Sequence, residues 1–351
     1  MRLDELIHRP AAWLPAEGPL GIVVSSRIRL ARNIEGVAFP GWAGDDECVR
    51  IQAQVWGMLQ GVRSLSPCLA VEMTSLNAVD RDVLRERHLI SNDLAQKFKG
   101  SGVVIRADEC LSVMVNEEDH LRLQALRSGL QLKELWADIN ELDDQIEQQV
   151  RFSFSPVLGY LTACPTNVGT GLRASAMVHV PGLRLINEMD PIIKGLTKIG
   201  LAVRGLQGEG TEASGNMFQI SNQMTLGESE SVIIDRLDRI VTEVAQHEAN
   251  ARIRLQEKRG AAIEDFVGRA YGVLCHARVL NSREALDMLS ALRFGCELGI
   301  IKNLELPDLN RLVLYSMPGH LQKSEGRLIP PDERDFVRAR LVRETVRQAS
   351  M

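Results

Sequence analysis

The spacing of apolar residues changes near residue 228, and this change limits the folds that are open to the chain. Over residues 21–223, short apolar or alternating runs typical of strands are separated by Gly and Asn turns and interleaved with helical stretches over 45–62 and 79–98. Over residues 228–259, apolar side chains instead recur at helical spacing, which predicts one long amphipathic helix. We therefore expect an α+β domain that ends in a helix bridging to a second domain.

The remainder of the chain is poor in strand patterns. Residues 262–280 and 282–294 read as helices, and Pro330-Pro331-Asp332 is a suitable start for a third helix that runs to Gln348. A length of 351 residues also exceeds what one hydrophobic core usually organises. We expect a helical C-terminal domain, with the boundary near Arg259.

Composition and charge exclude several classes of protein. Hydrophobic residues at 45% and charged residues at 25% are typical of a globular chain, and a net charge of −5 argues against direct nucleic-acid binding. No apolar run reaches the roughly 18 to 20 residues that a membrane span needs, and residues 1–15 lack the pattern of a signal peptide. The sequence therefore predicts a cytoplasmic protein without a membrane partner. Six cysteines without a C-x-x-C pair predict neither a metal site nor a disulfide framework.

The first candidate site motif is Ser25-Ser26-Arg27-Ile28-Arg29-Leu30, which follows an apolar run. In a strand, alternation places Arg27 and Arg29 on one face and Ile28 and Leu30 on the other. Two arginines then point the same way. The solvated face of an edge strand gives the same pattern.

The second motif runs from Asn116 to Arg122 and contains three consecutive acids. If the apolar strand before it continues, Glu118, His120 and Arg122 share one face. The alternative is the acidic first turn of a helix. The residue pattern leaves both readings open.

Two glycine-rich segments follow. Residues 162–175 contain a match to a dinucleotide-binding fingerprint at Gly169 to Ala174, but the strand, turn, helix and later acid that it requires are not convincing, so we favour a turn that brings backbone N–H groups and Arg173 to an anion. Residues 204–215 hold four glycines and suit a mobile loop that carries Glu209 over a substrate, with an ordinary surface loop as the alternative. Walker A, H-R-D and D-F-G motifs are absent from the sequence.

In this order, the four segments resemble the catalytic domain of the phosphagen (guanidino) kinase family, and in particular the bacterial protein-arginine kinases of the McsB type. The matching strings are Ser-x-Arg-x-Arg, Asn-Glu-Glu-Asp-His-Leu-Arg, Cys-Pro-Thr-Asn-x-Gly-Thr-Gly-Leu-Arg and Arg-Gly-x-x-Gly-Glu. The resemblance implies an antiparallel sheet flanked by helices over residues 1–255. It also implies an all-helical domain over 256–351 that dimerises and recognises phosphoarginine.

The resemblance assigns roles to individual residues. Glu118 and Glu209 match the carboxylates that hold the substrate guanidinium and accept its proton, and Cys164 matches a reactive thiol, with a buried inert cysteine as the alternative. ATP and Mg²⁺ are the implied cofactors, and positive charge around the phosphates fits phosphoryl transfer. The implied nucleotide site comprises Ser25, Ser26, Arg27, Ile28, Arg29, His88, Arg122, Arg173, Ala174, Ser175, Ala176, Met177, Arg204, Gly205, Leu206, Gln207, Gly208 and Glu209.

The substrate expected from the resemblance is arginine within proteins. Only 24 residues precede Ser25, where phosphagen kinases carry a small helical domain that encloses a free guanidino compound. A more open site suits an arginine on a polypeptide. The alternatives are a small-molecule guanidino kinase and a catalytically silent phosphoarginine-binding regulator, and the intact set of arginines and glutamates speaks against the silent protein.

A final motif, Arg334-Asp335-Phe336-Val337-Arg338-Ala339, resembles an allosteric phosphoarginine receptor. Arg334 and Arg338 share a helix face and suit a phosphate, while Asp335 suits a guanidinium and Ala339 completes the motif. A salt-bridged surface helix is the alternative. By resemblance, the expected partners are proteins with exposed arginines, an activator protein, a Clp-type AAA+ protease that degrades marked substrates, and a second copy of the chain.

Overall fold

The computed structural model describes residues 3–14, 21–97, 99–205 and 214–348. The chain divides into two compact units, which are described separately. Unit 1 comprises residues 1–13, 25–175 and 221–238, and unit 2 comprises 14–24, 176–220 and 239–351. The domain boundary at residue 255 expected from the sequence stays a prediction.

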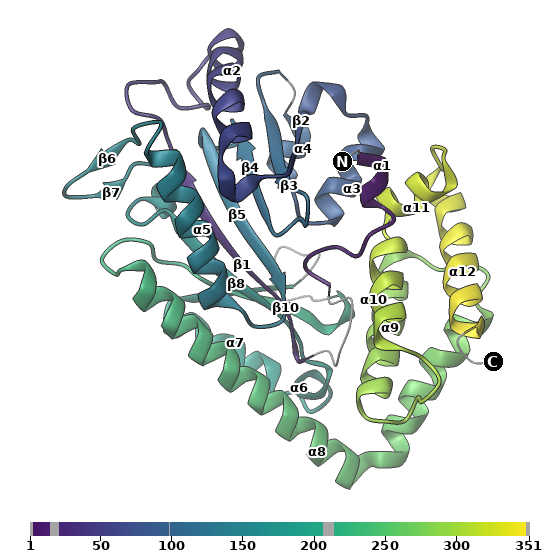
Figure 1. Cartoon of the computed structure of the whole chain (residues 1–351). Helices are drawn as coiled ribbons and strands as arrows, with labels where there is room; N and C mark the ends of the chain where they lie inside the picture. Colours follow the sequence, from purple (N-terminus) through teal and green to yellow (C-terminus); the bar gives the residue numbers. More distant parts are fainter. Residues whose placement is uncertain (1–2, 15–20, 98, 206–213, 349–351) are drawn as a thin grey trace. The chain divides into compact units, whose positions relative to one another are not determined.

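The strands form one large sheet and one small hairpin (Figure 1). The large sheet has eight strands in the order β2-β3-β4-β5-β1-β8-β10-β9, and neighbouring strands from β2 to β1 run antiparallel. This confirms the expected antiparallel sheet. The strand bounds are β1 Val23–Arg32, β2 Cys68–Glu72, β3 Gly102–Arg106, β4 Leu111–Val115, β5 Leu121–Ser128, β8 Leu172–His179, β9 Leu201–Gly205 and β10 Met217–Asn222. The hairpin pairs β6 (Phe154–Ser155) with β7 (Gly159–Tyr160).

Unit 1 carries helices α1 (Leu3–Leu6), α2 (Asp45–Gly61), α3 (Ala78–Glu86), α4 (Asn92–Gln96) and α5 (Leu132–Glu147), with short 3₁₀ turns at Arg63–Leu65, Met73–Ser75 and Pro165–Asn167. The helix expected over 45–62 is confirmed. The single helix expected over 79–98 is wrong, because His88 takes a left-handed φ of 59° and interrupts the chain between α3 and α4. The Ser91 hydroxyl then accepts from the Leu94 N–H and starts α4 anew.

Strand register separates the two faces of the sheet in unit 1. On one face, Val104 pairs with Val113 and Val113 with Leu123, and Leu30 pairs with Leu123 in turn. These side chains are fully buried, and Figure 1 shows α2 and α5 lying along the sheet. Burial on this scale contributes roughly 25 cal/mol per Å² of apolar surface. The apolar side chains of β1 are therefore fixed inward.

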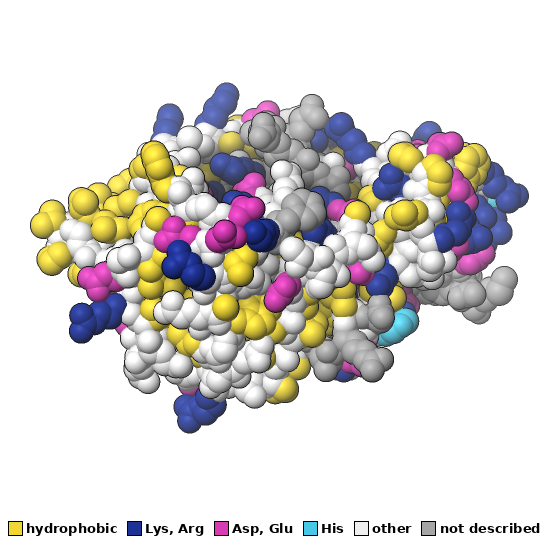
Figure 2. Space-filling view, turned by 90° about the horizontal axis from the view of Figure 1, so that it is seen from above, with side chains coloured by type: hydrophobic (Ala, Val, Ile, Leu, Met, Phe, Trp, Pro, Cys, Tyr) yellow, Lys and Arg dark blue, Asp and Glu magenta, His cyan; other side chains and the backbone are white. Residues whose placement is uncertain are grey.

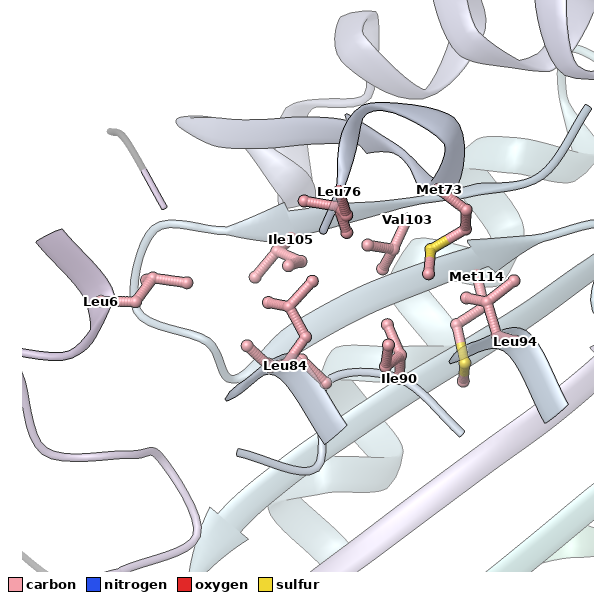
Figure 3. Close-up of a cluster of buried hydrophobic side chains, with 10 residues drawn as sticks. Leu6, Met73, Leu76, Leu84, Ile90, Leu94, Val103, Ile105 and Met114 are labelled. Carbon is pink, nitrogen blue, oxygen red and sulfur yellow. The ribbon is translucent and has the colours of Figure 1, made fainter. Parts of the chain in front are cut away.

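The opposite face is covered only in part. Over β3 and β4 it carries a core cluster that α1, α3 and α4 contribute to, with Leu6, Leu84, Val103, Ile105 and Met114 among its members (Figure 3). Along the same face, Met114 pairs with Arg122 of β5, so the apolar row ends in an arginine. The exposed continuation of this face is therefore charged.

Unit 2 is mostly helical after the end of β10. Its helices are α6 (Pro181–Leu185), α7 (Met189–Lys198), α9 (Ser282–Glu297), α10 (Leu306–Tyr315), α11 (Pro318–Glu325) and α12 (Pro331–Gln348), with a 3₁₀ turn at Ser214–Asn216. The long helix α8 (Glu230–His276) begins in unit 1. A helical C-terminal region is thus confirmed. No helix in the described ranges is long and apolar enough to cross a membrane.

Helix α8 changes two expectations. The amphipathic helix predicted over 228–259 is present, but it does not end there, and the helix predicted to begin at residue 262 is its continuation to His276. Arg259 marks the junction with non-helical angles of φ −141° and ψ 28°. Leu255 and Ile263, on either side of this break, pack into the same cluster as Phe294 of α9. Shared burial explains why the helix resumes.

A buried polar network secures the end of β8 in unit 2. The ring of His179 lies 2.7 Å from the hydroxyl of Ser290 on α9. Arg252 and Arg293 both contact the carboxylate of Glu297, at 2.8 and 3.0 Å. Burial, and then the two neighbouring arginines, hold the pKa of His179 well below its usual range, so its ring is neutral.

Candidate active site

Three arginines emerge from the open face of unit 1. In the β1–β5 register, Arg29 lies opposite Gln124 and Ala31 opposite Arg122, and cross-strand partners point to the same side of a sheet. Alternation places Arg27 on that side as well. Ile28 between them is fully buried on the other face. The predicted shared face of Arg27 and Arg29 is therefore present, and Arg122 belongs to it.

Strand β8, which neighbours β1, supplies a fourth arginine. The Arg173 guanidinium donates to the Ser221 hydroxyl at 3.3 Å. The Ser175 hydroxyl of the same strand donates to the carbonyl of Arg27 at 3.4 Å, which links the two strands. Four arginines from three strands are thus brought together, as their mutual electrostatic influence also shows.

The clustered charges repel one another in a poorly solvated place. Burial first, and then the charges of Arg173 and Arg122, lower the pKa of Arg27 to about 10. The pKa of Arg29 is lowered well below its ordinary value by burial and by the other three arginines, against a smaller opposing effect of Glu117. An anion with several charges would relieve this repulsion. The site therefore fits a polyphosphate.

Two adjacent glutamates have different environments. Glu117 is fully buried, and its carboxylate accepts from both the Arg122 guanidinium and the Ser91 hydroxyl. Glu118 is 40% exposed and touches Arg122 only at 3.5 Å. The sequence does not predict that Glu117 binds Arg122, because the pattern of two adjacent acids does not indicate which of them is buried. Glu118 is left available to a ligand.

The ionisation of Glu118 fits a proton acceptor. Burial is the largest influence and raises the pKa of its carboxyl; the Arg122 charge opposes this, while the neighbouring acids Asp119, Glu117 and Asp93 add to it. A carboxylate with a raised pKa is a better base than an ordinary glutamate.

The prediction that Glu118, His120 and Arg122 share one strand face is wrong, and so is the helix alternative. Strand β4 ends at Val115 and β5 begins at Leu121, so Glu118 lies in the connection between them. We call residues 116–120 the Glu118 turn. Its first residue, Asn116, has a φ of 53° and donates its backbone N–H to the His120 carbonyl at 2.9 Å. The turn bends the chain, and strand alternation no longer applies.

His120 supports this turn from inside. Its Nδ1 accepts from the Ile34 N–H at 3.1 Å, so Nε2 carries the proton and donates to the Ala38 carbonyl at 3.0 Å. Burial lowers the pKa of His120. The imidazole is therefore a neutral structural group rather than part of the charged surface.

Asp119 joins the Glu118 turn to the segment that contains Cys164. Its buried carboxylate accepts from the Asn33 amide at 2.6 Å and from the Ala163 N–H at 2.7 Å. The Cys164 thiol, which is partly exposed, lies 2.9 Å from the Thr166 hydroxyl. Asp119, which follows Glu118, is therefore bonded to Ala163, which precedes Cys164. The reactive role expected for Cys164 stays a prediction.

His88 is held against the arginine face. The Gln124 amide donates to its carbonyl at 2.7 Å, and the ring of Trp13 meets its imidazole edge-on at 4.7 Å. Burial first, and then the charges of Arg27 and Arg29, lower the pKa of His88 to about 3. A neutral imidazole can accept or donate a hydrogen bond here without adding to the positive charge.

The remaining candidates for the nucleotide site are mostly buried. Ser25, Ser26 and Ile28 of β1 and residues 174–177 of β8 are inaccessible side chains that form the sheet under the arginines. The Ser26 hydroxyl donates to the Gly129 carbonyl at 2.7 Å. In unit 2, Arg204 is exposed at the end of β9 and Gly205 is buried. Leu206, Gln207, Gly208 and Glu209 lie outside the described residues, so the second carboxylate stays a prediction.

The C-terminal motif on α12 is divided by burial. Arg338 is almost fully buried, and its guanidinium donates to the carbonyls of Ser316 and Leu280 at 2.7 and 2.8 Å and to the Asp335 carboxylate at 2.5 Å. Arg334 is only partly buried, and no protein group described here accepts from its Nε. Ala339 is buried. The structure thus ties Arg338 and Asp335 to the protein, and a role of Arg334 in binding a ligand stays a prediction.

The described residues contain no group of three or more His, Cys, Asp or Glu side chains that suits a metal ion. Mg²⁺ usually binds through substrate phosphates, waters and one or two carboxylates. The four-arginine face fits the triphosphate of ATP, and a magnesium ion would then be held mainly by that nucleotide.

Two family models match this chain. The model described as ATP:guanido phosphotransferase, C-terminal catalytic domain, matches residues 51–251, and the model described as protein-arginine kinase McsB C-terminal domain matches residues 260–351. The first match contains Arg122, Glu118 and Arg173, and the second contains Arg334.

Similar proteins agree with these matches. The chain is 47% identical to a protein-arginine kinase of Moorella thermoacetica, over 96% of this chain and 98% of that protein. It is 46% identical to a protein-arginine kinase of Geobacillus thermodenitrificans, over 96% and 94%.

Solved structures of low sequence identity share the fold. A lombricine kinase matches 70% of this chain and 76% of its own with a TM-score of 0.57 at 24% identity. A duplicated taurocyamine kinase from Schistosoma mansoni, with bound transition state analog components, matches 81% of this chain and 43% of its own with a TM-score of 0.60 at 21% identity. With an arginine-lined face beside an available glutamate, and with both family models matched, the chain belongs to the ATP:guanido phosphotransferase family.

Proposed function

We propose that this chain is an ATP-dependent protein-arginine kinase, which transfers the γ-phosphoryl group of ATP to the guanidinium of arginine residues in proteins. The observation that carries the proposal is the face of unit 1 on which Arg27, Arg29, Arg122 and Arg173 lie together, with Glu118 available beside Arg122. One side of this arrangement suits a phosphate donor, and the other suits a cationic acceptor.

On the acceptor side, a substrate guanidinium is protonated in water and has no lone pair for attack. Glu118 orients the planar group and accepts a proton as one nitrogen attacks the γ-phosphorus. The new N–P bond forms while the bond from phosphorus to the β,γ-bridging oxygen breaks, and ADP leaves with that electron pair. Glu209 is the second carboxylate by family resemblance, and Cys164 matches a reactive thiol near the guanidinium in the same resemblance.

On the donor side, the arginines of β1, β5 and β8 hold the phosphates and stabilise the charge that spreads over the transferring group. Arg204 completes this set by resemblance. A bound Mg²⁺ ion supplies further charge neutralisation at the phosphate oxygens. Neutral His88 borders this face without adding repulsion.

Acceptor preference for protein follows from the relatives. Proteins named protein-arginine kinase match along almost the whole chain, and the McsB-type C-terminal domain model matches residues 260–351. The rival acceptor is a free guanidino compound. The same active-site chemistry serves both, so geometry within unit 1 does not separate them.

The experiment supplies γ-labelled ATP and Mg²⁺ with either an unfolded arginine-containing protein or free arginine at the same arginine concentration. A kinase of this class labels the protein with an acid-labile phosphoramidate and labels free arginine poorly. Efficient labelling of free arginine without protein label identifies a small-molecule kinase. Absence of both labels, together with binding of free phosphoarginine measured by calorimetry, supports the silent phosphoarginine-binding protein instead.

Several finer assignments belong to the same proposal. We assign the protein to the cytoplasm, with a dimer formed through residues 256–351 and a phosphoarginine receptor at Arg334 to Ala339. An activator protein and a Clp-type AAA+ protease are the proposed partners by family resemblance. Sedimentation of the full chain with and without phosphoarginine tests the dimer and the receptor together.

A further inference from the structure

Four large apolar side chains of unit 1 are exposed on two segments that are bonded to the Glu118 turn. Trp42 is 91% exposed, Phe154 57%, Val157 85% and Leu158 45%. We call these four residues the apolar rim. Single exposed apolar residues are ordinary. Several exposed apolar residues on two segments attached to the same turn indicate a site that binds a partner.

The β6–β7 hairpin carries three of the four. At its base, the Ser153 N–H donates to the Asn33 carbonyl at 2.7 Å, and the Asn33 amide donates to the Leu161 carbonyl at 3.1 Å. The same amide donates to Asp119 at 2.6 Å. One asparagine thus joins the hairpin to the residue that follows Glu118.

The fourth residue, Trp42, lies on the loop after β1. The Ala38 carbonyl of this loop accepts from His120, and the ring of Phe39 meets the His120 ring edge-on at 6.1 Å. The Trp42 N–H donates to the Phe39 carbonyl at 2.8 Å. The loop is therefore attached to the other end of the Glu118 turn.

The hairpin rests on a firm base rather than lying loose on the surface. The Arg32 guanidinium stacks on the Tyr160 ring at 3.5 Å and pairs with buried Asp143 at 2.7 Å. Figure 1 shows β6 and β7 projecting from this base, and Figure 2 shows hydrophobic side chains gathered on the same side of the view. An anchored hairpin with an apolar tip is suited to contact another chain.

We propose that the apolar rim binds apolar side chains that flank the phosphoacceptor arginine in an extended polypeptide. The inference rests on the proposed function, since it takes Glu118 as the group that receives the guanidinium. A chain that delivers an arginine to Glu118 extends about 3.3 Å per residue to either side, and the two segments bonded to Asp119 and His120 are the ones that bear the rim. Folded proteins bury such apolar residues, so the rim favours unfolded substrates over native ones.

The test uses the full chain with the substitutions Val157→Ser and Leu158→Ser together, and separately Trp42→Ala. Two labelled peptides each contain one arginine, flanked by Leu and Phe in one and by Ser and Gly in the other. The matched control is Ile199→Ser, because Ile199 is 51% exposed and follows α7 in unit 2. Fluorescence anisotropy measures peptide binding, and label transfer measures kcat and KM.

The expected result is that either rim variant weakens binding of the apolar peptide and raises its KM by about tenfold, with kcat almost unchanged, because only ground-state binding is lost. The Ser/Gly peptide and the control variant should change by less than about twofold. Binding is measured without phosphoryl transfer. A protein that binds the apolar peptide through the rim but transfers no label therefore contradicts the proposed function and leaves the rim intact.

Three outcomes overturn the proposal that the apolar rim binds the substrate. If wild type and both variants bind the apolar peptide equally well, the rim does not contact the peptide. An equal loss on both peptides shows a structural defect instead of apolar recognition. A change of sedimentation mass in the rim variants shows that these residues join two copies of the chain.

Discussion

The guanidinium of Arg122 donates to the fully buried carboxylate of Glu117. The pair fixes one cation of the four-arginine face, while Glu118, one residue further along, remains 40% exposed. Glu117 therefore positions Arg122, whereas we propose that Glu118 receives the substrate guanidinium.

Replacing Glu118 should slow phosphoryl transfer and leave nucleotide binding intact. Glu118→Gln keeps the side-chain volume but removes the proton acceptor, so turnover should fall by roughly a hundredfold or more. ATP affinity, measured by calorimetry, should stay within about twofold of wild type, because the arginines of β1 and β8 are untouched. Near-normal turnover in this variant would exclude Glu118 as the base.

The pH dependence of turnover should also reflect the role of Glu118 as the base. Glu118 acts as a base only when ionised, and burial raises the pKa of its carboxyl above the ordinary 4.5. Turnover at saturating substrates should therefore fall, as pH is lowered, through a pKa above 4.5. ATP titrates in this region too, so the comparison with Glu118→Gln decides the assignment. If the residual activity of that variant falls in the same way at low pH, protonation of Glu118 is not the cause of the fall.

Glu117 and Arg122 should behave as a coupled pair. Glu117→Gln should raise the KM for ATP severalfold, because Arg122 loses its fixed partner. Since both changes disturb the same contact, a double-mutant cycle with Arg122→Ala should show a coupling energy of about 1 to 3 kcal/mol. Losses should be equal for every guanidino acceptor, as the donor side is shared. Additive effects, or a loss confined to one acceptor, would contradict the positioning role.

His88 should remain neutral in the folded protein far below the usual pKa of histidine. Its pKa falls to about 3 in the folded state, whereas an unfolded chain takes up the proton near 6.5. The unfolded state therefore binds more protons between these values, and His88 makes stability decrease as pH falls through 6.5 toward 3. His179 and His120 contribute in the same direction.

The check on His88 is an NMR titration of its ring together with unfolding of His88→Gln between pH 7 and pH 4. The variant should lose less stability over this range than wild type. Protonation of His88 in the folded protein near pH 6 would show that the arginine face is better solvated than the structure indicates.

The sequence predicted the residues of the arginine face better than the local structure around them. Alternation alone placed Arg27 and Arg29 on one side, because a half-buried strand leaves no other arrangement for Ile28 and Leu30. Alternation does not place Arg122 beside these two arginines, because that depends on which strands pair. The family resemblance implied this neighbourhood, and the β1–β5 register shows it. Pairing between distant segments has no local sequence signal.

Errors arose where side-chain contacts override local periodicity. Residues 79–98 have a helical pattern, yet Arg87 is buried against Glu109 and His88 turns left-handed, so the helix breaks. The Glu118 turn likewise follows from Asn116, whose amide donates to the carbonyls of Cys48 and Gly100. Helices α10 and α11 were missed because their apolar patterns are short. Glu209 lies outside the described residues and stays a prediction.

The last prediction separates structure from recognition in the C-terminal motif. Arg338→Ala removes the donor to two buried carbonyls and leaves a cavity, so it should destabilise the protein by about 2 to 4 kcal/mol. Arg334→Ala should change stability by less than about 1 kcal/mol, because its guanidinium is only partly buried. Arg340→Ala is a matched control, since Arg340 on the same helix is half exposed and pairs with Glu325.

If this motif receives phosphoarginine, Arg334→Ala should lose the response of the full chain to free phosphoarginine while keeping its melting temperature and basal turnover. An effector shifts activity only through different affinities for two states, so loss of the binding donor removes the shift. Asp335 is a poorer probe, because its carboxylate holds Arg338 and its replacement disturbs both roles. A full response in Arg334→Ala, with loss only in unfolded Arg338→Ala, would make the motif a structural element of α12 and place the effector site elsewhere.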